Sequence, residues 1–173
     1  ALLLVALLGS SCEALTVNSL PELVTAILVS PDTTIELGAN ITMDSSSSDI
    51  PIVRPLTLKA AAGTTLNGGG SYRIFTVNAN VTFEGITFTN AKPAAGVGGA
   101  VNITNGTVTF TGCTFSNNTS SVSGGAVHVT GGTAGFGGTT SFSANSAPSG
   151  GALSSLSPLS FGDVIFSGNI ATG

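Results

Sequence analysis

The sequence predicts an all-β fold, a parallel β-helix whose short strands coil around one core, and two repeated motifs carry this prediction. Gly-Gly-Ala occurs three times, with 26 residues from each copy to the next. A Phe-x-x-Asn motif alternates with it, and Phe88 precedes the first copy of this motif by the same number of residues that separates the first two copies. A fixed period of this length indicates one supersecondary unit stacked on copies of itself. The motif residues are Gly98, Gly99, Ala100, Gly124, Gly125, Ala126, Gly150, Gly151, Ala152, Phe88, Phe115, Phe142, Phe166, Asn118, Asn145 and Asn169.

The pattern inside one unit is that of strands. In residues 81–89 and 108–116, apolar residues alternate with small polar residues, as in a strand with one buried face. A unit this short has no room for a helical crossover, so parallel strands with short turns are expected, about 4.8 Å from coil to coil. Three interior columns are predicted: Phe88, Phe115, Phe142 and Phe166; Phe83, Phe110, Phe136 and Phe161; Val101, Val127 and Leu153.

The motif glycines and asparagines have mechanical roles in such a fold. Paired glycines before a strand allow a positive φ at a corner and a close approach of neighbouring backbones. Asparagine at equivalent turns tolerates the left-handed conformation and can bond the next coil, which predicts an asparagine ladder.

Residues 1–14 are predicted to be a signal peptide truncated at its start, with an apolar run followed by a small-residue cleavage site beside Cys12. The run is too short to span a bilayer. The alternative is a buried apolar N-terminal segment. Because the chain stops where the next Gly-Gly-Ala falls due, its C-terminus is expected to be incomplete, as in a piece of a longer secreted protein.

Residues 15–33 are predicted to form an N-terminal cap with a short helix. Ser19 and Glu22 make a Ser-x-x-Glu capping box, and the helix is expected to stop at Ser30. Its apolar face would cover the open end of the first coil. That face comprises Leu20, Leu23, Val24, Ile27 and Leu28.

The β-helix itself is predicted over residues 34–173, with the motif repeats in residues 81–173. Before the repeats, the apolar and β-branched pattern predicts strands at 34–37, 41–43, 56–58, 65–66 and 74–77. Residues 45–48 should form a loop and residues 67–70 a wide turn.

The low charge of the chain argues against two classes of partner. Only 7% of the residues are charged, and the net charge is −4 with four basic residues. Nucleic-acid binding needs a basic footprint, and so does binding to an anionic membrane surface. No nucleic-acid partner is therefore expected, and no membrane span is expected in this chain because its apolar run is too short.

No residue pattern in the sequence points to a catalytic, cofactor or metal site. The acidic residues, among them Asp49 and Glu84, show no spacing that recurs from coil to coil, as paired acid–base or Ca²⁺ chemistry would need. Nucleotide-binding loops and Cys/His metal spacings are missing from the sequence. His128 lies between two inward-facing valines, so it is expected to point outward as a surface residue.

Cys113 is predicted to be a buried free thiol. It holds the inward position that Ile86 and Val164 take in neighbouring coils. Two cysteines do not make a disulfide framework, so Cys113 is read as a small buried hydrophobic residue.

Six Asn-x-Ser/Thr sites are candidate N-glycan acceptors if the source is eukaryotic. Turn asparagines that serve the fold explain the same residues equally well. The six are Asn40, Asn80, Asn102, Asn105, Asn117 and Asn118.

The alternation of Gly-Gly-Ala-(Val/Leu) with Phe-x-x-Asn resembles the repeat of the polymorphic outer membrane proteins of chlamydiae, over about residues 81–173. The resemblance implies a right-handed, pectate-lyase-like parallel β-helix that is exported and displayed at the cell surface, often as an adhesin. Two positions depart from the pattern: Asn90 follows Phe88 one place early, and Ser155 stands where Val129 predicts an apolar residue.

These observations favour a secreted or cell-surface scaffold, at the outer membrane if bacterial, with an adhesive, binding or structural role and no catalysis. Its ligand stays open between a carbohydrate and a host or cell-surface protein. Binding is expected to use the broad polar sides of the stacked strands, where many weak contacts add up. The alternative is a fragment of a carbohydrate-active β-helix enzyme, a polysaccharide lyase or hydrolase whose catalytic coils lie outside this chain.

Overall fold

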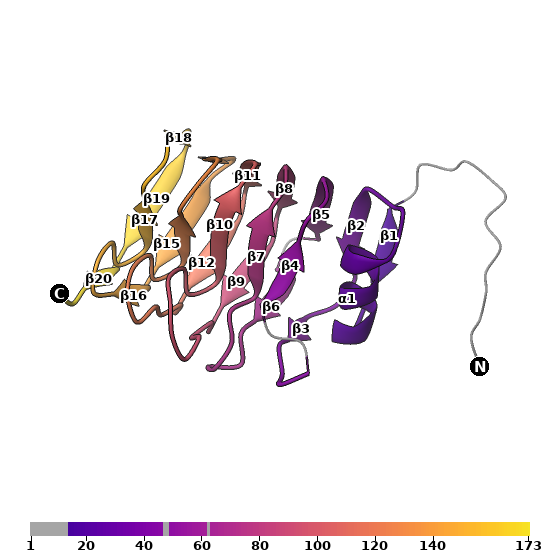
Figure 1. The fold of residues 1–173 in the computed structure, drawn as a ribbon, viewed down its shortest axis with the longest axis horizontal. Helices are drawn as coiled ribbons and strands as arrows, with labels where there is room; N and C mark the ends of the chain where they lie inside the picture. The colour runs from indigo at the N-terminus through magenta and orange to yellow at the C-terminus, as the bar shows by residue number, and fades with distance from the viewer. Residues whose placement is uncertain (1–13, 47–48, 62) are drawn as a thin grey trace, which may run out of the picture.

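The computed structural model describes residues 14–46, 49–61 and 63–173, which form a stack of coils with the N-terminal helix at one end (Figure 1). The signal-peptide prediction falls on residues 1–13 and on Ala14, so nearly all of it lies outside the described residues. The predicted loop at 45–48 is described only in part.

Parallel strands make up almost all of the regular structure. The first sheet holds β1 (Leu15–Val17), β2 (Thr34–Leu37), β5 (Leu56–Ala60), β8 (Val81–Glu84), β11 (Thr107–Thr111), β14 (Thr133–Gly137) and β18 (Leu159–Phe161). The second sheet holds β3 (Ile41–Thr42), β6 (Thr65–Asn67), β9 (Thr87–Thr89), β12 (Thr114–Ser116), β15 (Thr140–Ser143) and β19 (Val164–Ser167). The third holds β4 (Ile50–Ile52), β7 (Phe75–Asn78), β10 (Val101–Asn105), β13 (Val127–Val129) and β17 (Leu153–Ser155), and β16 (Ser146–Ala147) pairs separately with β20 (Ile170–Ala171).

From β2 onward, the chain visits the first, second and third sheets in turn, so that three strands complete one coil. The described residues make five such coils, and β18 and β19 begin a sixth. Neighbouring coils pair in parallel, for example β12 with β9 and β15. The predicted parallel β-solenoid is confirmed.

The predicted phenylalanine columns form the centre of the core. Phe88, Phe115, Phe142 and Phe166 stack with ring centroids 4.7 to 4.9 Å apart and nearly parallel planes. The second column meets them edge-on, as between Phe110 and Phe115 at 5.2 Å. Phe166 is half exposed, because no described coil lies beyond it.

The other two columns also have the register that the sequence predicts. Phe83, Phe110, Phe136 and Phe161 stack at 5.0 to 5.7 Å. Val101, Val127 and Leu153 occupy matching places in β10, β13 and β17. Offset stacking at these distances adds to the apolar burial of each ring.

Helix α1 (Leu20–Leu28) lies at the N-terminal end and buries Leu23 and Ile27 in the same core. The predicted capping box forms only in part: Ser19 is the N-cap, but its side chain makes no cap hydrogen bond. Glu22 instead accepts a hydrogen bond from the backbone N–H of Asn18 at 2.7 Å. The predicted apolar face is wrong at Leu28, which is 48% exposed and lies in the last turn.

Arg54 fastens this cap to the coils. Its guanidinium donates to the carbonyls of Ala26, Ile27 and Asp32 at 2.7 to 3.0 Å. The first two carbonyls belong to the last turn of α1, where backbone acceptors are free and a cation is favourable.

The strand pattern missed β4 because Pro51 lies at its centre. Proline cannot donate to a ladder and is confined to edge strands. β4 is the edge of the third sheet, with β7 on one side, and its Ile50 and Ile52 are buried while Pro51 is exposed.

Candidate functional site

The longest described connections lie at one corner of the solenoid, where the chain passes from the second sheet to the third. We call the connections at residues 68–74, 90–100, 117–126 and 144–152 the loop corner. The connection at residues 43–49 also runs from the second sheet to the third but is described only in part, and the other fully described connections between sheets have three residues or fewer. In stacked repeats, insertions of this kind map to one face, which is often the binding face.

The asparagine of Phe-x-x-Asn is the second residue of the last two connections of the loop corner. Asn118 accepts the backbone N–H of Ala91 and donates to the carbonyl of Phe88, both in the preceding coil. It also donates to Oδ1 of Asn145 at 3.0 Å, and Asn145 donates in turn to Oδ1 of Asn169 at 2.9 Å. Asn118 and Asn145 are fully buried, so the predicted asparagine ladder is an internal hydrogen-bond network.

The left-handed turn falls one residue before the ladder, which corrects the expectation that the motif asparagine itself adopts it. Asn117 has φ of 55° and Ala144 has φ of 53°, directly before Asn118 and Asn145. Asn90, with φ of 52°, takes this turn place in the earlier coil. Asn90, which follows Phe88 one place early, is therefore a turn residue. Ala91 occupies the position that Asn118 and Asn145 take in later coils, and its N–H donates to the first ladder asparagine, Asn118.

Gly-Gly-Ala ends the last three connections of the loop corner, at residues 90–100, 117–126 and 144–152. The first glycine, such as Gly124 with φ of 64°, has the left-handed conformation that a side chain would strain. A Cβ on the second glycine, such as Gly125, would collide with the carbonyl oxygen of Gly151 in the next coil. The alanine that follows is buried, as at Ala126. The predicted roles of the paired glycines are confirmed by these positions.

Between the two motifs lie segments that differ from coil to coil, at residues 91–97, 119–123 and 146–149. Their exposed side chains include Lys92, Ala94, Ala95, Ser121, Val122 and Pro148. The motifs thus determine where each segment starts and ends, while about half of the residues between them, those named above among them, face solvent. This arrangement displays varied side chains on a rigid support.

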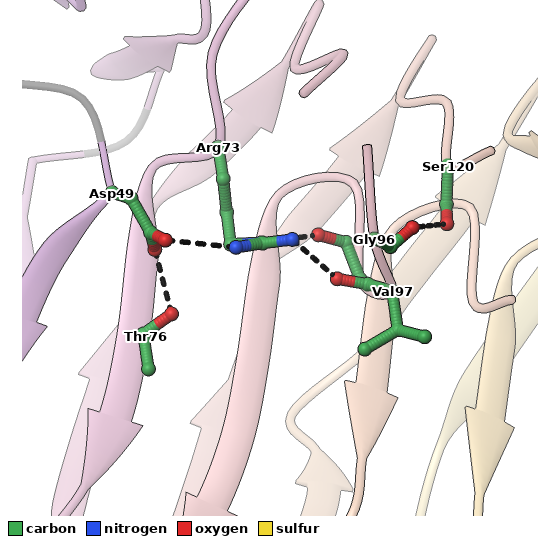
Figure 2. A network of polar contacts seen from close by, with 7 residues as sticks. Asp49, Arg73, Thr76, Gly96, Val97 and Ser120 are labelled. Carbon is green, nitrogen blue, oxygen red and sulfur yellow. Dashed lines mark hydrogen bonds and ion pairs between the residues drawn. The ribbon is translucent and has the colours of Figure 1, made fainter. Parts of the chain in front are cut away.

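A polar network holds the first of these segments in place (Figure 2). Arg73 donates to Asp49 at 2.8 Å and to the carbonyls of Val97 and Gly98 at 2.8 and 2.9 Å. Thr76 donates to the same carboxylate at 2.6 Å. The Arg73 side chain is only 12% exposed, so these bonds satisfy a largely buried cation. Asp49, one of the acidic residues without a recurring spacing, is thereby engaged in a structural contact.

Ser120 extends this support from the next coil. Its hydroxyl donates to the carbonyl of Gly96 at 2.9 Å (Figure 2), and it accepts from the backbone N–H of Val122 and Ser123. Two neighbouring connections of the loop corner are therefore joined by a direct hydrogen bond.

The expectation that His128 is a surface residue is wrong. Its side chain is 6% exposed, although its inward neighbours Val127 and Val129 have the predicted orientation. The connection that leads into β13 covers it: the Ser123 hydroxyl lies 3.0 Å from Nδ1 of His128. Burial lowers the pKa of the imidazole from its ordinary value. The sequence pattern gave the direction of the side chain but could not reveal the loop above it.

Cys113 is buried, as predicted, and is the free cysteine of the described chain. Burial raises the pKa of its thiol to about 11. In the register of the strands, Thr140 lies between Cys113 and Val164, and its hydroxyl accepts the N–H of Cys113 at 3.3 Å.

The remaining charged residues do not converge. Lys59 pairs with Glu36 at 3.3 Å across neighbouring coils, and Glu84 follows them in the same outward column. Within the described residues, no group of three or more His, Cys, Asp or Glu side chains could hold a metal ion. The described part of the chain also has no helix that is long and apolar enough to cross a bilayer.

The candidate glycan acceptors divide by exposure. Asn40, Asn80, Asn105 and Asn117 are exposed and Asn102 is partly buried. Asn118 is different, because both N–H groups of its amide are used in the buried ladder, which leaves no room for a glycan in the folded chain.

Comparison with known proteins gives one match. Residues 108–130 match the family model of the Chlamydia polymorphic membrane protein (Pmp) repeat. This stretch contains β11, β12 and β13, with Phe115, Asn118 and Gly124 of the two motifs. No curated protein and no solved structure matches, so the pectate-lyase-like description of the fold is not confirmed. The repeat match and the parallel β-solenoid around it fit a Pmp-type repeat protein built as a β-helix.

Proposed function

We propose that this chain is a non-catalytic scaffold, displayed at the cell surface, that binds its partner through the loop corner. The observation that carries the proposal is the contrast between the buried motif residues and the exposed residues that lie between them. Asn118 and Gly125 are buried and serve the fold, whereas Ser121 and Val122 between them are exposed. Exposed loops on a rigid scaffold are the usual place for recognition.

The repeat match supports the location. A family described by its membrane protein repeat points to the outer membrane or the cell surface. The apolar residues at the start of the sequence favour export. Secretion and surface display thus belong to the same proposal as the binding role.

The engagement of the charged residues supports a non-catalytic role. Arg54 and Arg73 bond backbone carbonyls, and Lys59 pairs with Glu36. Acid–base or Ca²⁺ chemistry on polysaccharides would need acidic groups that converge on one site. We therefore expect no release of unsaturated or reducing ends from pectin or alginate, and such release would contradict this part of the proposal.

Binding is tested with fluorescently labelled chain on cultured animal cells. We expect saturable binding that falls in part, and does not vanish, when residues 119–145 are deleted. This deletion joins Asn118 to Ser146 and so removes one coil while keeping the order of the motifs. Because contacts repeat from coil to coil, losing one coil should weaken avidity without abolishing it. Absence of binding by the intact chain, or equal binding by both chains, would overturn the proposed role.

A further inference from the structure

The loop corner contains a pocket of about 330 Å³ that spans three successive coils. It is lined by Gly70, Ser71, Lys92, Pro93, Ala94, Thr119 and Ser121. Three residues with hydroxyl side chains and one lysine thus line one pocket, although they come from connections about 25 residues apart in sequence. A volume near 300 Å³ is at the small end of ligand pockets, which suits a single ring rather than a long chain.

Lys92 is the free cation of the described chain. Arg54, Lys59 and Arg73 are all held by backbone carbonyls or carboxylates. Among the described residues, no hydrogen bond or ion pair engages the ammonium of Lys92, and none of the pocket residues is acidic. A lysine left unpaired beside hydroxyl groups can bind an anionic ligand group without first breaking an internal ion pair.

Hydrogen bonds also hold the backbone segments that line the pocket. Arg73 and Ser120 hold the carbonyls of Val97 and Gly96, in the same segment that carries Lys92 (Figure 2). The backbone N–H of Thr119 donates to the carbonyl of Ala91 at 2.8 Å, so the segment that carries Thr119 and Ser121 is joined to the segment that carries Lys92. A binding site whose walls are held in advance loses less conformational entropy when a ligand enters.

We propose that this pocket binds the carboxylate-bearing ring of an acidic sugar. Lys92 would bind the carboxylate, the hydroxyls of Ser71, Thr119 and Ser121 would exchange hydrogen bonds with ring hydroxyls, and Pro93 with Ala94 would contact the apolar face of the ring. This inference rests on the proposed binding role and names the ligand class for one part of the loop corner.

The test compares glucuronate with glucose, which differ only at C6, where a carboxylate replaces a hydroxymethyl group, by amide-shift titration of the whole chain in low-salt buffer. We expect glucuronate to shift the amides of Ser71, Thr119 and Ser121, and glucose to bind about ten-fold more weakly or not at all. Lys92→Gln should weaken glucuronate binding about ten-fold, because it removes a charge-assisted contact. Lys92→Arg should retain binding, and added salt should weaken it.

Lys59→Gln is the matched control, since it removes the same charge from an exposed lysine outside the loop corner. Equal affinity for the two sugars, an unchanged affinity in Lys92→Gln, or an equal loss in Lys59→Gln would overturn the inference. The binding of the intact chain to cells is measured in parallel. If cells are bound but glucuronate is not, the pocket is rejected and the scaffold proposal stands; if neither is bound, both are rejected.

Discussion

Asn118 and Asn145 are joined across neighbouring coils by two hydrogen bonds to one oxygen. The backbone N–H and the side-chain Nδ2 of Asn118 both donate to Oδ1 of Asn145, each at 3.0 Å. Both side chains are fully buried, so their polar atoms need partners inside the fold, and the carbonyls of Phe88 and Phe115 supply two more. The asparagine of Phe-x-x-Asn is therefore a structural element of the β-helix.

Replacing Asn145 by alanine should be strongly destabilising. The change leaves the N–H of Asn118 and the carbonyl of Phe115 without their partner inside the fold. Each buried unsatisfied group costs about 1–3 kcal/mol, so we expect a loss of about 3 kcal/mol or more in urea unfolding. Asn105→Ala, at an exposed site, should stay within about 0.5 kcal/mol. Similar losses for the two variants would show that the ladder adds little.

Phe115→Ala tests the packing of the aromatic column. Phe115 stacks on Phe88 and Phe142 at 4.8 and 4.7 Å and is fully buried. Truncating such a ring leaves a cavity, and the expected loss in the free energy of unfolding is about 3–5 kcal/mol. Phe166→Ala should cost clearly less, because that ring is half exposed. If Phe115→Ala left the free energy of unfolding unchanged, the core would be loosely packed at this position.

His128 should make the free energy of unfolding depend on pH in the range below about pH 6.5, the ordinary pKa of histidine. Its pKa is lowered in the folded state by burial, so the unfolded chain takes up a proton first. The stabilising contribution is therefore complete above pH 6.5 and is lost as the pH falls from there toward the lowered pKa. His128→Gln should remove this part of the slope in unfolding experiments. A difference in the free energy of unfolding between the unsubstituted chain and His128→Gln that stays constant across this pH range would contradict the prediction.

Cys113 should resist thiol reagents in the native state. The side chain is buried and its pKa is raised to about 11, so the reactive thiolate is scarce and inaccessible. Labelling should proceed at the rate at which the coil opens, and become fast in denaturant. Labelling of the folded chain at the rate seen in denaturant would contradict the buried thiol.

The fold was largely predictable because its core repeats. Phe88, Phe115 and Phe142 recur every 27 residues, close to the 26-residue spacing of Gly124 and its equivalents, and a solenoid is the arrangement that brings such positions into register. β4 escaped prediction because the pattern was broken by Pro51, which only the edge position of that strand explains. The partial failure at Ser19 is local, since Glu22 bonds the N–H of Asn18 instead.

The candidate site was far less predictable. The pocket joins Ser71, Lys92 and Thr119 from three coils, and sequence spacing does not reveal how long connections fold against one another. His128 shows the same limit, because its strand gives its direction while Ser123, in a separate connection, decides its burial. Alternation along a strand predicts which side chains face the core, whereas loop contacts depend on tertiary packing.

The central claim is that motif residues hold the fold while the exposed loop-corner residues bind. It is tested by a chain that carries five substitutions at exposed positions there: Lys92→Gln, Ala94→Ser, Ala95→Ser, Ser121→Ala and Val122→Thr. The control carries five at exposed positions elsewhere: Ala61→Ser, Glu84→Gln, Asn105→Ser, Thr111→Ser and Thr130→Ser.

The decisive measurement is cell binding together with urea unfolding of these two chains. We predict that the loop-corner variant loses most of its binding, because two of the three exposed segments are changed, and that its free energy of unfolding changes by no more than about 1 kcal/mol, because its substitutions touch no motif residue. The control should keep both properties. Retained binding by the loop-corner variant, or equal loss in the control, would contradict the account.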